Sequence, residues 1–266
     1  MKKITVLIMT LLFTVGLISG CGTNTAKNTA SETPKKIVVG LDDNYPPMGF
    51  KDENNEITGF DIDVAKEAAK RLGREVEFKA IDWDSKEAEL KSGRVDVLWN
   101  GLDITEKRKE NMMFSEPYMD NRQIVFVQKG NPAAIKSVDD LKGKVIGTQS
   151  GGTAEEYIDG NAEFKNSLKG VKKYSDYISA FMDLETGRID AIVSDEITGR
   201  YYMSKHPEKL EALEIVVGPV STFGIGFRKD DQSLHDEIQK VLDEMKADGT
   251  MSRISEKWFD KDITKK

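Results

Sequence analysis

Strand and helix signals alternate along this chain. β-branched runs at Ile37–Leu41 and 76–81 flank a segment in which apolar residues recur at helical spacing from Ile62 to Leu72, and which Gly73 ends. Parallel strands need connections of this length, so the alternation predicts mainly parallel sheets covered by helices. The fold class predicted from the pattern is α/β.

The same alternation restarts near residue 122. Apolar runs at 145–147 and 189–193 predict buried strands of a second unit. Alternating apolar stretches near 122–128 and 217–227 indicate extended segments that cross between the units. Other predicted strands lie at 95–99, 124–128, 214–217 and 223–227. Predicted helices lie at 85–91 (capped by Asp84), 137–141, 174–185, 196–204 and 233–247. Three further helices are predicted: one begins at 105, another begins at 153, and a short last one ends near 259.

The first 20 residues have the features of an export signal. Two lysines precede an uncharged apolar run over 4–18, which is shorter than the about 20 residues that a membrane span needs. Residues 17–21 resemble a bacterial lipobox, in which the cysteine becomes the lipidated first residue of the mature protein. The sequence therefore predicts a lipoprotein signal peptide over 1–20 and lipidation of Cys21.

Residues 21–35 are expected to form the lipidated cysteine and a flexible tether, because small and polar side chains with no large apolar residue cannot order themselves. Cys21 is the only cysteine, so it has no partner for a disulfide. Cleavage removes two of the 39 basic residues and leaves 37 against 46 acidic residues, a net charge of −9. An acidic body argues against nucleic acid or an anionic membrane surface as partner.

Residues 100–108 carry the strongest local indication of a ligand site. They follow a predicted strand, and Thr105 is a suitable helix N-cap. Arg108 then falls at the third helical position, where the macrodipole disfavours a cation. Arginine holds a carboxylate through two parallel hydrogen bonds, so this position predicts an anion site for a small carboxylate ligand. The alternative is a solvated helix start in which Arg108 pairs with Asp103 or Glu106.

Several short motifs follow one another along the mature chain. The most specific reads Gly-Phe-Asp-Ile-Asp-Val-Ala-Lys, and the set covers residues 59–66, 40–47, 82–84, 100–108, 114–118, 140–144, 246–250 and 257–259. On these motifs, the chain from 36 to 259 resembles the bacterial extracellular solute-binding proteins of family 3, the substrate-binding lipoproteins of polar amino-acid ABC transporters.

The resemblance implies a two-lobed, periplasmic-binding-protein-like clamshell with two crossover strands. It implies a first lobe of residues 36–121 plus 222–266 and a second lobe of residues 122–221. Ligands of open α/β sheets bind at the carboxyl ends of strands, and the candidate residues follow predicted strands.

The resemblance also assigns roles to individual residues. Arg108 resembles the clamp of the ligand α-carboxylate. Gly151, Gly152 and Thr153 resemble the second-lobe loop that completes this site, and a helix start at Thr153 suits an anion. Asp195 resembles the carboxylate that receives the α-ammonium. Asp195 could instead cap the following helix, and the glycine pair could be an ordinary loop.

The side-chain pocket is implied at Asp42, Tyr45 and Trp83, whose aromatic rings would form flat walls for an aliphatic or cationic stem. Asn100 and Gly101 begin the segment that leads to the arginine and belong to the expected site. The two aromatic residues could instead belong to the core, and Asp42 could be a turn carboxylate.

Asp103 departs from the family pattern, which has Ser or Thr at this position. If Asp42, Asp103 and Asp195 all face the cleft, three carboxylates meet one arginine. An amino-acid zwitterion brings no net charge, so the surplus acid favours a basic ligand such as lysine, arginine, ornithine or histidine.

The expected function is the amino-acid-binding component of an ABC importer, which captures a free amino acid between its lobes and delivers it to the permease. We expect a monomer that is lipid-anchored at the extracytoplasmic face of the cell membrane, without catalytic residues, metal or cofactor. One alternative is a cyclohexadienyl-type dehydratase with a cleft carboxylate as general acid. The other is a ligand sensor for a membrane signalling partner, although such sensors usually continue into a transmembrane helix and this chain ends at Lys266.

Overall fold

The computed structural model describes residues 36–265. The predicted signal peptide, Cys21 and the predicted tether lie outside the described residues. Across 36–265, none of the helices has the length together with the apolar composition that spanning a bilayer requires.

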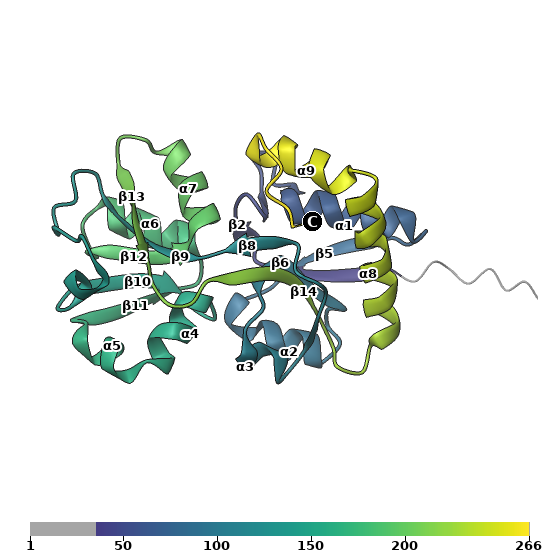
Figure 1. Ribbon diagram of the computed structural model, residues 1–266, viewed down its shortest axis with the longest axis horizontal. Helices are drawn as coiled ribbons and strands as arrows, with labels where there is room; N and C mark the ends of the chain where they lie inside the picture. The colour runs from purple at the N-terminus through teal and green to yellow at the C-terminus, as the bar shows by residue number, and fades with distance from the viewer. Residues whose placement is uncertain (1–35, 266) are drawn as a thin grey trace, which may run out of the picture. The chain divides into compact units, whose positions relative to one another are not determined.

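The first sheet combines strands from both ends of the described chain (Figure 1). Its strands are β1 (Ile37–Leu41), β5 (Val76–Ala80), β6 (Val97–Asp103), β7 (Met113–Phe114), β8 (Met119–Asn121) and β14 (Ser221–Phe227). The order is β5-β1-β6-β14-β7, and β8 also pairs with β14. β1 is parallel to β5 and β6, whereas β14 runs antiparallel to β6.

Helices cover both faces of this sheet: Figure 1 shows α1 (Phe60–Arg71) and α9 (Thr250–Phe259) on one face and α2 (Lys86–Lys91) and α3 (Glu106–Lys109) on the other. The amphipathic pattern of the sequence explains the packing of these elements, because a helix must bury its apolar stripe. The remaining elements are α8 (Gln232–Ala247), the 3-10 turn η1 (Trp83–Ser85) and a small sheet of β2 (Asn44–Tyr45), β3 (Gly49–Lys51) and β4 (Ile57–Thr58).

The second sheet has the order β11-β10-β12-β9-β13. These strands are β9 (Gln123–Gln128), β10 (Val145–Gln149), β11 (Gly170–Tyr174), β12 (Ala191–Asp195) and β13 (Leu210–Val216). β10 is parallel to β11 and β12, whereas β9 is antiparallel to its neighbours. Its helical elements are η2 (Val138–Leu141), α4 (Thr153–Gly160), α5 (Ala162–Ser167), α6 (Tyr177–Glu185) and α7 (Glu196–Lys205).

Two extended segments connect the sheets. Only Arg122 separates β8 from β9, and residues 217–220 lead back from β13 to β14. Asn121 of β8 lies opposite Ser221 of β14 in an antiparallel pair, so the crossing segments lie side by side (Figure 1). The observed topology is the two-lobed α/β arrangement with two crossing strands that the sequence predicts.

We propose the predicted limits as those of the first lobe (36–121 plus 222–266) and the second lobe (122–221). The change of sheet between β8 and β9 supports one limit, and the return to the first sheet at β14 supports the other within one residue.

Some predicted elements differ from the observed ones. The strand expected at 95–99 extends to Asp103, with every residue buried, because β14 pairs along it as far as Phe223 opposite Asp103. The helix expected from Tyr174 begins at Tyr177, since Tyr174 ends β11.

The predicted helix cap at Asp84 is wrong. The carboxylate of Asp82 caps η1 instead, accepting a hydrogen bond from Asp84 N at 3.2 Å, and α2 starts two residues after Asp84. The small three-stranded sheet, β11 and α5 were not predicted. These elements are short or polar, so local periodicity does not mark them.

Gly199 of α7 tests the packing of the second lobe. A Cβ at this glycine would lie 2.1 Å from Cζ of Phe126, a fully buried ring of β9. We expect Gly199→Ala to lower the free energy of unfolding by about 1–3 kcal/mol, because a packed core cannot absorb the overlap without strain. Urea unfolding of the mature chain, with Gly160→Ala as the control helical glycine whose Cβ meets nothing within 4 Å, measures the effect. Equal stability of the two variants would contradict this packing.

Candidate functional site

The predicted site residues lie where strands of both sheets end. Asp42 follows β1, Asp103 ends β6 and Asp195 ends β12. Apart from the half-buried Gly151, every predicted site residue is buried. Hydrogen bonds between the two lobes bring these groups together.

Asp103 faces the second lobe. Its carboxylate accepts hydrogen bonds from Thr153 Oγ1 at 2.6 Å, Ser221 Oγ at 2.5 Å and Asn121 Nδ2 at 3.0 Å. Burial raises the pKa of Asp103 to about 7, and nearby Asp195 adds to this shift, whereas the positive charge of Arg108 opposes it. The one residue that departs from the family pattern is thus a bridge between the lobes.

Asp195 shares its donors with Asp103. Its carboxylate accepts from Gln123 Nε2 at 2.6 Å and from Asn121 Nδ2. Although Asp195 occupies the N-cap position of α7, its side chain makes no capping hydrogen bond, which contradicts the helix-cap alternative. The Asn121 amide therefore joins a carboxylate of the first lobe to one of the second.

Arg108 is 2% exposed, which contradicts the alternative of a solvated helix start. Its backbone N–H donates to Thr105 Oγ1, so the predicted N-cap is confirmed. The guanidinium donates from Nη1 to the Asp103 carbonyl at 3.0 Å and from Nη2 to the Gly151 carbonyl at 3.2 Å. Its Nε lies 3.5 Å from Glu156 Oε2. The arginine thus reaches from α3 to the second lobe.

The turn at Gly151 needs its glycine for two reasons. Its φ is +71°, and a Cβ there would lie 2.7 Å from Cα of Asp84 and 2.9 Å from the carbonyl oxygen of Trp83. The backbones of the two lobes therefore touch at this point. Gly152 and Thr153 follow at the start of α4, as predicted.

Asp42 makes a second connection between the lobes. Its carboxylate accepts from Gln149 Nε2 at 2.5 Å and from Asn44 N at 2.9 Å, and its own N–H donates to Asn100 Oδ1 at 3.1 Å. Burial raises the pKa of Asp42 to about 6, against the opposing effect of these hydrogen bonds to its carboxylate. Asp42 therefore makes the turn contact of the alternative interpretation, with Asn44, and also contacts Gln149 of the second lobe.

Aromatic rings line the space beside these carboxylates. The ring centroids of Tyr45 and Tyr177 are 6.2 Å apart, one from each lobe. Neither hydroxyl has a hydrogen-bond partner among the described residues, and Thr198 Oγ1 lies near Tyr45 without hydrogen-bond geometry. Burial raises the pKa of both tyrosines well above 10. Gly101 is required beside Tyr45, since its φ is +56° and a Cβ would lie 2.7 Å from Tyr45 Cε1.

Several residues of this site were not predicted. Lys86 lies on the buried face of α2 together with Leu90, four positions later, so a charge on an apolar face was the available signal. Tyr177 at the start of α6 was also missed. The other missed residues lie in the crossing segments or at a strand end, and they are Asn121, Gln123, Gln149 and Ser221.

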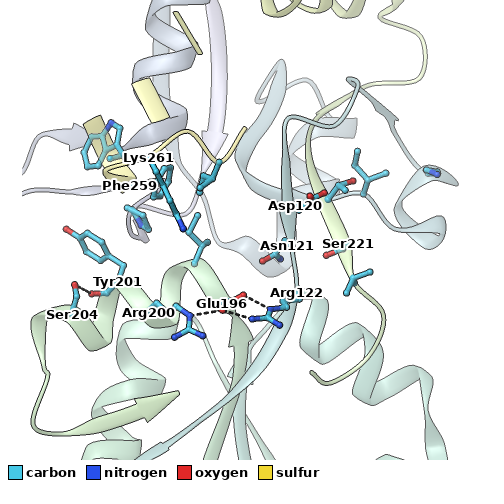
Figure 2. A pocket seen from close by; sticks show the side chains of 18 residues that line it. Asp120, Asn121, Arg122, Glu196, Arg200, Tyr201, Ser204, Ser221, Phe259 and Lys261 are labelled. Atoms are coloured by element: carbon cyan, nitrogen blue, oxygen red, sulfur yellow. Dashed lines mark hydrogen bonds and ion pairs between the residues drawn. The ribbon is translucent and has the colours of Figure 1, made fainter. Parts of the chain in front are cut away.

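A cavity of about 1050 Å³ adjoins this network, between the crossing segments, α7 and the end of α9 (Figure 2). Arg122 donates to both carboxylate oxygens of Glu196, at 2.5 and 2.8 Å, and Arg200 donates to Glu196 at 2.6 Å. The lining of the cavity includes Asn121 and Ser221 but none of the predicted site residues. The volume of this cavity therefore does not coincide with the cluster of buried charged groups at the predicted site.

Groups of three or more His, Cys, Asp or Glu side chains able to hold a metal ion are absent from residues 36–265.

The two lobes and the polar site at their junction define the class of two-domain α/β proteins that hold a small solute between lobes. Residues 37–261 match the bacterial extracellular solute-binding proteins, family 3, and the chain belongs to this family. The predicted family and clamshell fold are thereby confirmed.

The chain is similar to the L-cystine-binding protein of Escherichia coli K12, which is 35% identical over 229 residues, covering 86% of this chain and 84% of that protein. The ABC uptake transporter substrate-binding protein of Streptococcus pneumoniae, solved with bound histidine, is 33% identical with a TM-score of 0.82 and covers 87% of this chain and 95% of that chain. An ancestral arginine-binding protein bound to arginine is 41% identical with a TM-score of 0.79, and the match covers 85% of this chain and 99% of that chain.

The raised pKa of Asp103 predicts a pH effect on stability. The folded state binds this proton more tightly than the unfolded chain, whose pKa is near 3.8, so the contribution is fully present below about pH 4 and is lost as the pH rises through about 7. We expect Asp103→Asn to flatten the decline in unfolding free energy over this range, measured by urea titration at several pH values. A variant with the same pH slope as the wild type would contradict the assignment.

Proposed function

We propose that this protein is the extracellular amino-acid-binding component of an ABC importer, and that it captures one free amino acid between its lobes and delivers it to the permease. The observation that carries the proposal is the meeting of Arg108 with the Gly151–Thr153 turn, beside the paired carboxylates of Asp103 and Asp195. A cation and a carboxylate pair held by both lobes match the two charges of an amino-acid zwitterion. The names of the relatives support a binding function over a catalytic one.

In this proposal, the α-carboxylate binds Arg108 and the first amides of α4. A buried arginine offers two parallel donors, and the N-terminus of a helix favours an anion. Thr153 starts α4, and its hydroxyl already donates across the lobes to Asp103.

The α-ammonium binds Asp195, whereas Asp103 beside it supplies a further carboxylate for a cationic ligand. Both carboxylates are buried and hydrogen-bonded only to neutral donors among the described residues, so an ammonium would add the missing positive charge. The Asn121 amide that both accept would hold them at a common position.

The side-chain pocket lies at Asp42, Tyr45 and Trp83, with Tyr177 and Gln149 from the second lobe. Buried hydroxyls without partners, such as those of Tyr45 and Tyr177, commonly mark a place for a ligand or water.

A basic amino acid fits the charge balance of this site. The structure adds Lys86 to the predicted arginine, so three buried carboxylates face two buried cations. One positive charge on the ligand side chain would balance the remaining carboxylate. Among the relatives, arginine and histidine are basic and cystine is not.

Delivery to the permease depends on closure of the two lobes, and the bound amino acid shifts the population toward the closed arrangement. A ligand that contacts Arg108 on one lobe and Asp195 on the other stabilises the arrangement in which the lobes meet. We propose that a lipid on Cys21 keeps the monomer at the extracytoplasmic face of the membrane, where the permease takes the amino acid.

Thermal unfolding with a panel of amino acids tests the proposal. A ligand at 100 times its dissociation constant should add about 2.7 kcal/mol of stability. We expect the largest stabilisation from a basic amino acid such as L-arginine or L-histidine. Prephenate belongs in the panel, because turnover of this cyclic acid without stabilisation by any amino acid would favour the dehydratase alternative.

Replacement of the clamp should abolish tight binding. We expect Arg108→Ala to weaken L-arginine binding by about 100-fold or more, since truncating one partner of a buried charge pair costs about 2–5 kcal/mol. Isothermal titration calorimetry measures the affinity, and Arg94→Ala is the matched control, because the Arg94 side chain is 58% exposed. Unchanged affinity in Arg108→Ala would contradict the assigned role.

Asp103 should control the preference for a basic side chain. We expect Asp103→Ser to weaken L-arginine binding more than L-glutamine binding, because only the cationic ligand needs the extra carboxylate. Asp120→Ser removes a carboxylate that is 76% exposed in the crossing segment and serves as control. Equal effects of Asp103→Ser on both amino acids would contradict this prediction.

A further inference from the structure

Lys86 is a buried lysine at the contact between the lobes. It is 3% exposed, and its Nζ donates to the Trp83 carbonyl at 3.2 Å and to the Gly151 carbonyl at 2.7 Å. The ammonium also lies 5.2 Å from the centroid of the Trp83 ring. Its hydrogen bonds thus reach one backbone oxygen in each lobe.

The same Gly151 carbonyl accepts from Arg108 Nη2 at 3.2 Å, so two buried cations converge on one neutral oxygen. Two like charges in a desolvated place repel each other unless an anion balances them. Among the described residues, Arg108 has Glu156 at 3.5 Å, whereas Lys86 has no carboxylate within ion-pair distance.

The acidic groups near Lys86 form no ion pair with it, and two of them have other partners. Glu87 and Asp84 of its own segment and Glu156 of α4 all act to raise its pKa, whereas Arg108 of α3 lowers it. Glu87 accepts from Asn111 at 2.9 Å, and Glu156 accepts from Thr105 at 3.0 Å. Burial outweighs them and lowers the pKa of Lys86 from 10.5 to about 7.

We propose that Lys86 is a second cationic contact for the ligand carboxylate, which acts with Arg108 to make a carboxylate group a requirement for binding between the lobes. This inference rests on the proposed amino-acid-binding function. An anion placed at Arg108 lies beside the carbonyl that both cations share, so it supplies Lys86 with the counter-charge that the surrounding protein does not. Amines that lack a carboxylate leave both cations buried and mutually repelling.

The first test compares L-arginine with agmatine, its decarboxylated analogue, by isothermal titration calorimetry. In the wild type, L-arginine should bind far more tightly than agmatine. We expect Lys86→Met to reduce the ratio of the two affinities by about 10- to 100-fold, the range for one hydrogen bond to a charged group. Lys91→Met is the matched control on the same helix, since Lys91 is exposed.

A purely structural lysine gives a different result. If Lys86 only ties the lobes together through Gly151, Lys86→Met weakens L-arginine and agmatine by the same factor, and the inference is overturned. If no amino acid binds the wild type, both the proposed function and the inference fail. L-histidine with histamine, and L-cystine with cystamine, repeat the comparison if L-arginine does not bind.

Proton uptake provides a second readout. At about pH 7.5, slightly above the pKa of about 7 for Lys86, a bound carboxylate should raise that pKa and draw a proton from solution. Titrations in buffers of different ionisation enthalpy count this proton, and the difference between the wild type and Lys86→Met isolates it from proton release at Asp42 and Asp103. Identical proton counts in the two proteins would overturn the inference.

Discussion

The hydrogen bond from Thr153 to Asp103 is the contact on which the site depends. It joins the start of α4 in the second lobe to the end of β6 in the first, at a carboxylate that has no room for bulk water. A buried carboxylate is unstable without donors, so Ser221 and Asn121 of the crossing strands must hold it in place. The contact between the lobes and the position of the crossing strands are therefore coupled through one side chain.

Two kinds of charge are gathered at the junction of the lobes, and each is desolvated. Arg108 and Lys86 share the Gly151 carbonyl, whereas Asp103 and Asp195 share the Asn121 amide. Apart from Glu156, which lies 3.5 Å from Arg108, the partners of these groups are neutral and do not balance their charge. This separation of buried cations from buried carboxylates suits the proposed ligand, which carries both signs of charge.

The arrangement of the lobes could be predicted because its signals are periodic and local. Strand and helix alternation predicted both sheets, and the polar residues that follow strands meet at the junction of the lobes, where the site was expected. Thr105 was predicted as the cap of α3 from its side chain alone. In contrast, the extent of β6 depends on pairing with β14, which is more than a hundred residues away along the chain, and no local pattern reports this pairing. Gln149 was missed for the same reason, because its partner Asp42 lies on the opposite lobe.

By itself, the sequence determined the α/β class, the two units, the family and the set of chemical groups available to a ligand, since these follow from periodicity, motif order and residue type. Tertiary structure decided which of those groups meet. Asp103 could have turned to solvent or paired with Arg108 through its carboxylate, but the crossing strands direct it toward Thr153, and Arg108 contacts only its backbone carbonyl. The reason is physical: buried charges are placed by donors that come from distant segments, and only the folded chain brings those segments together.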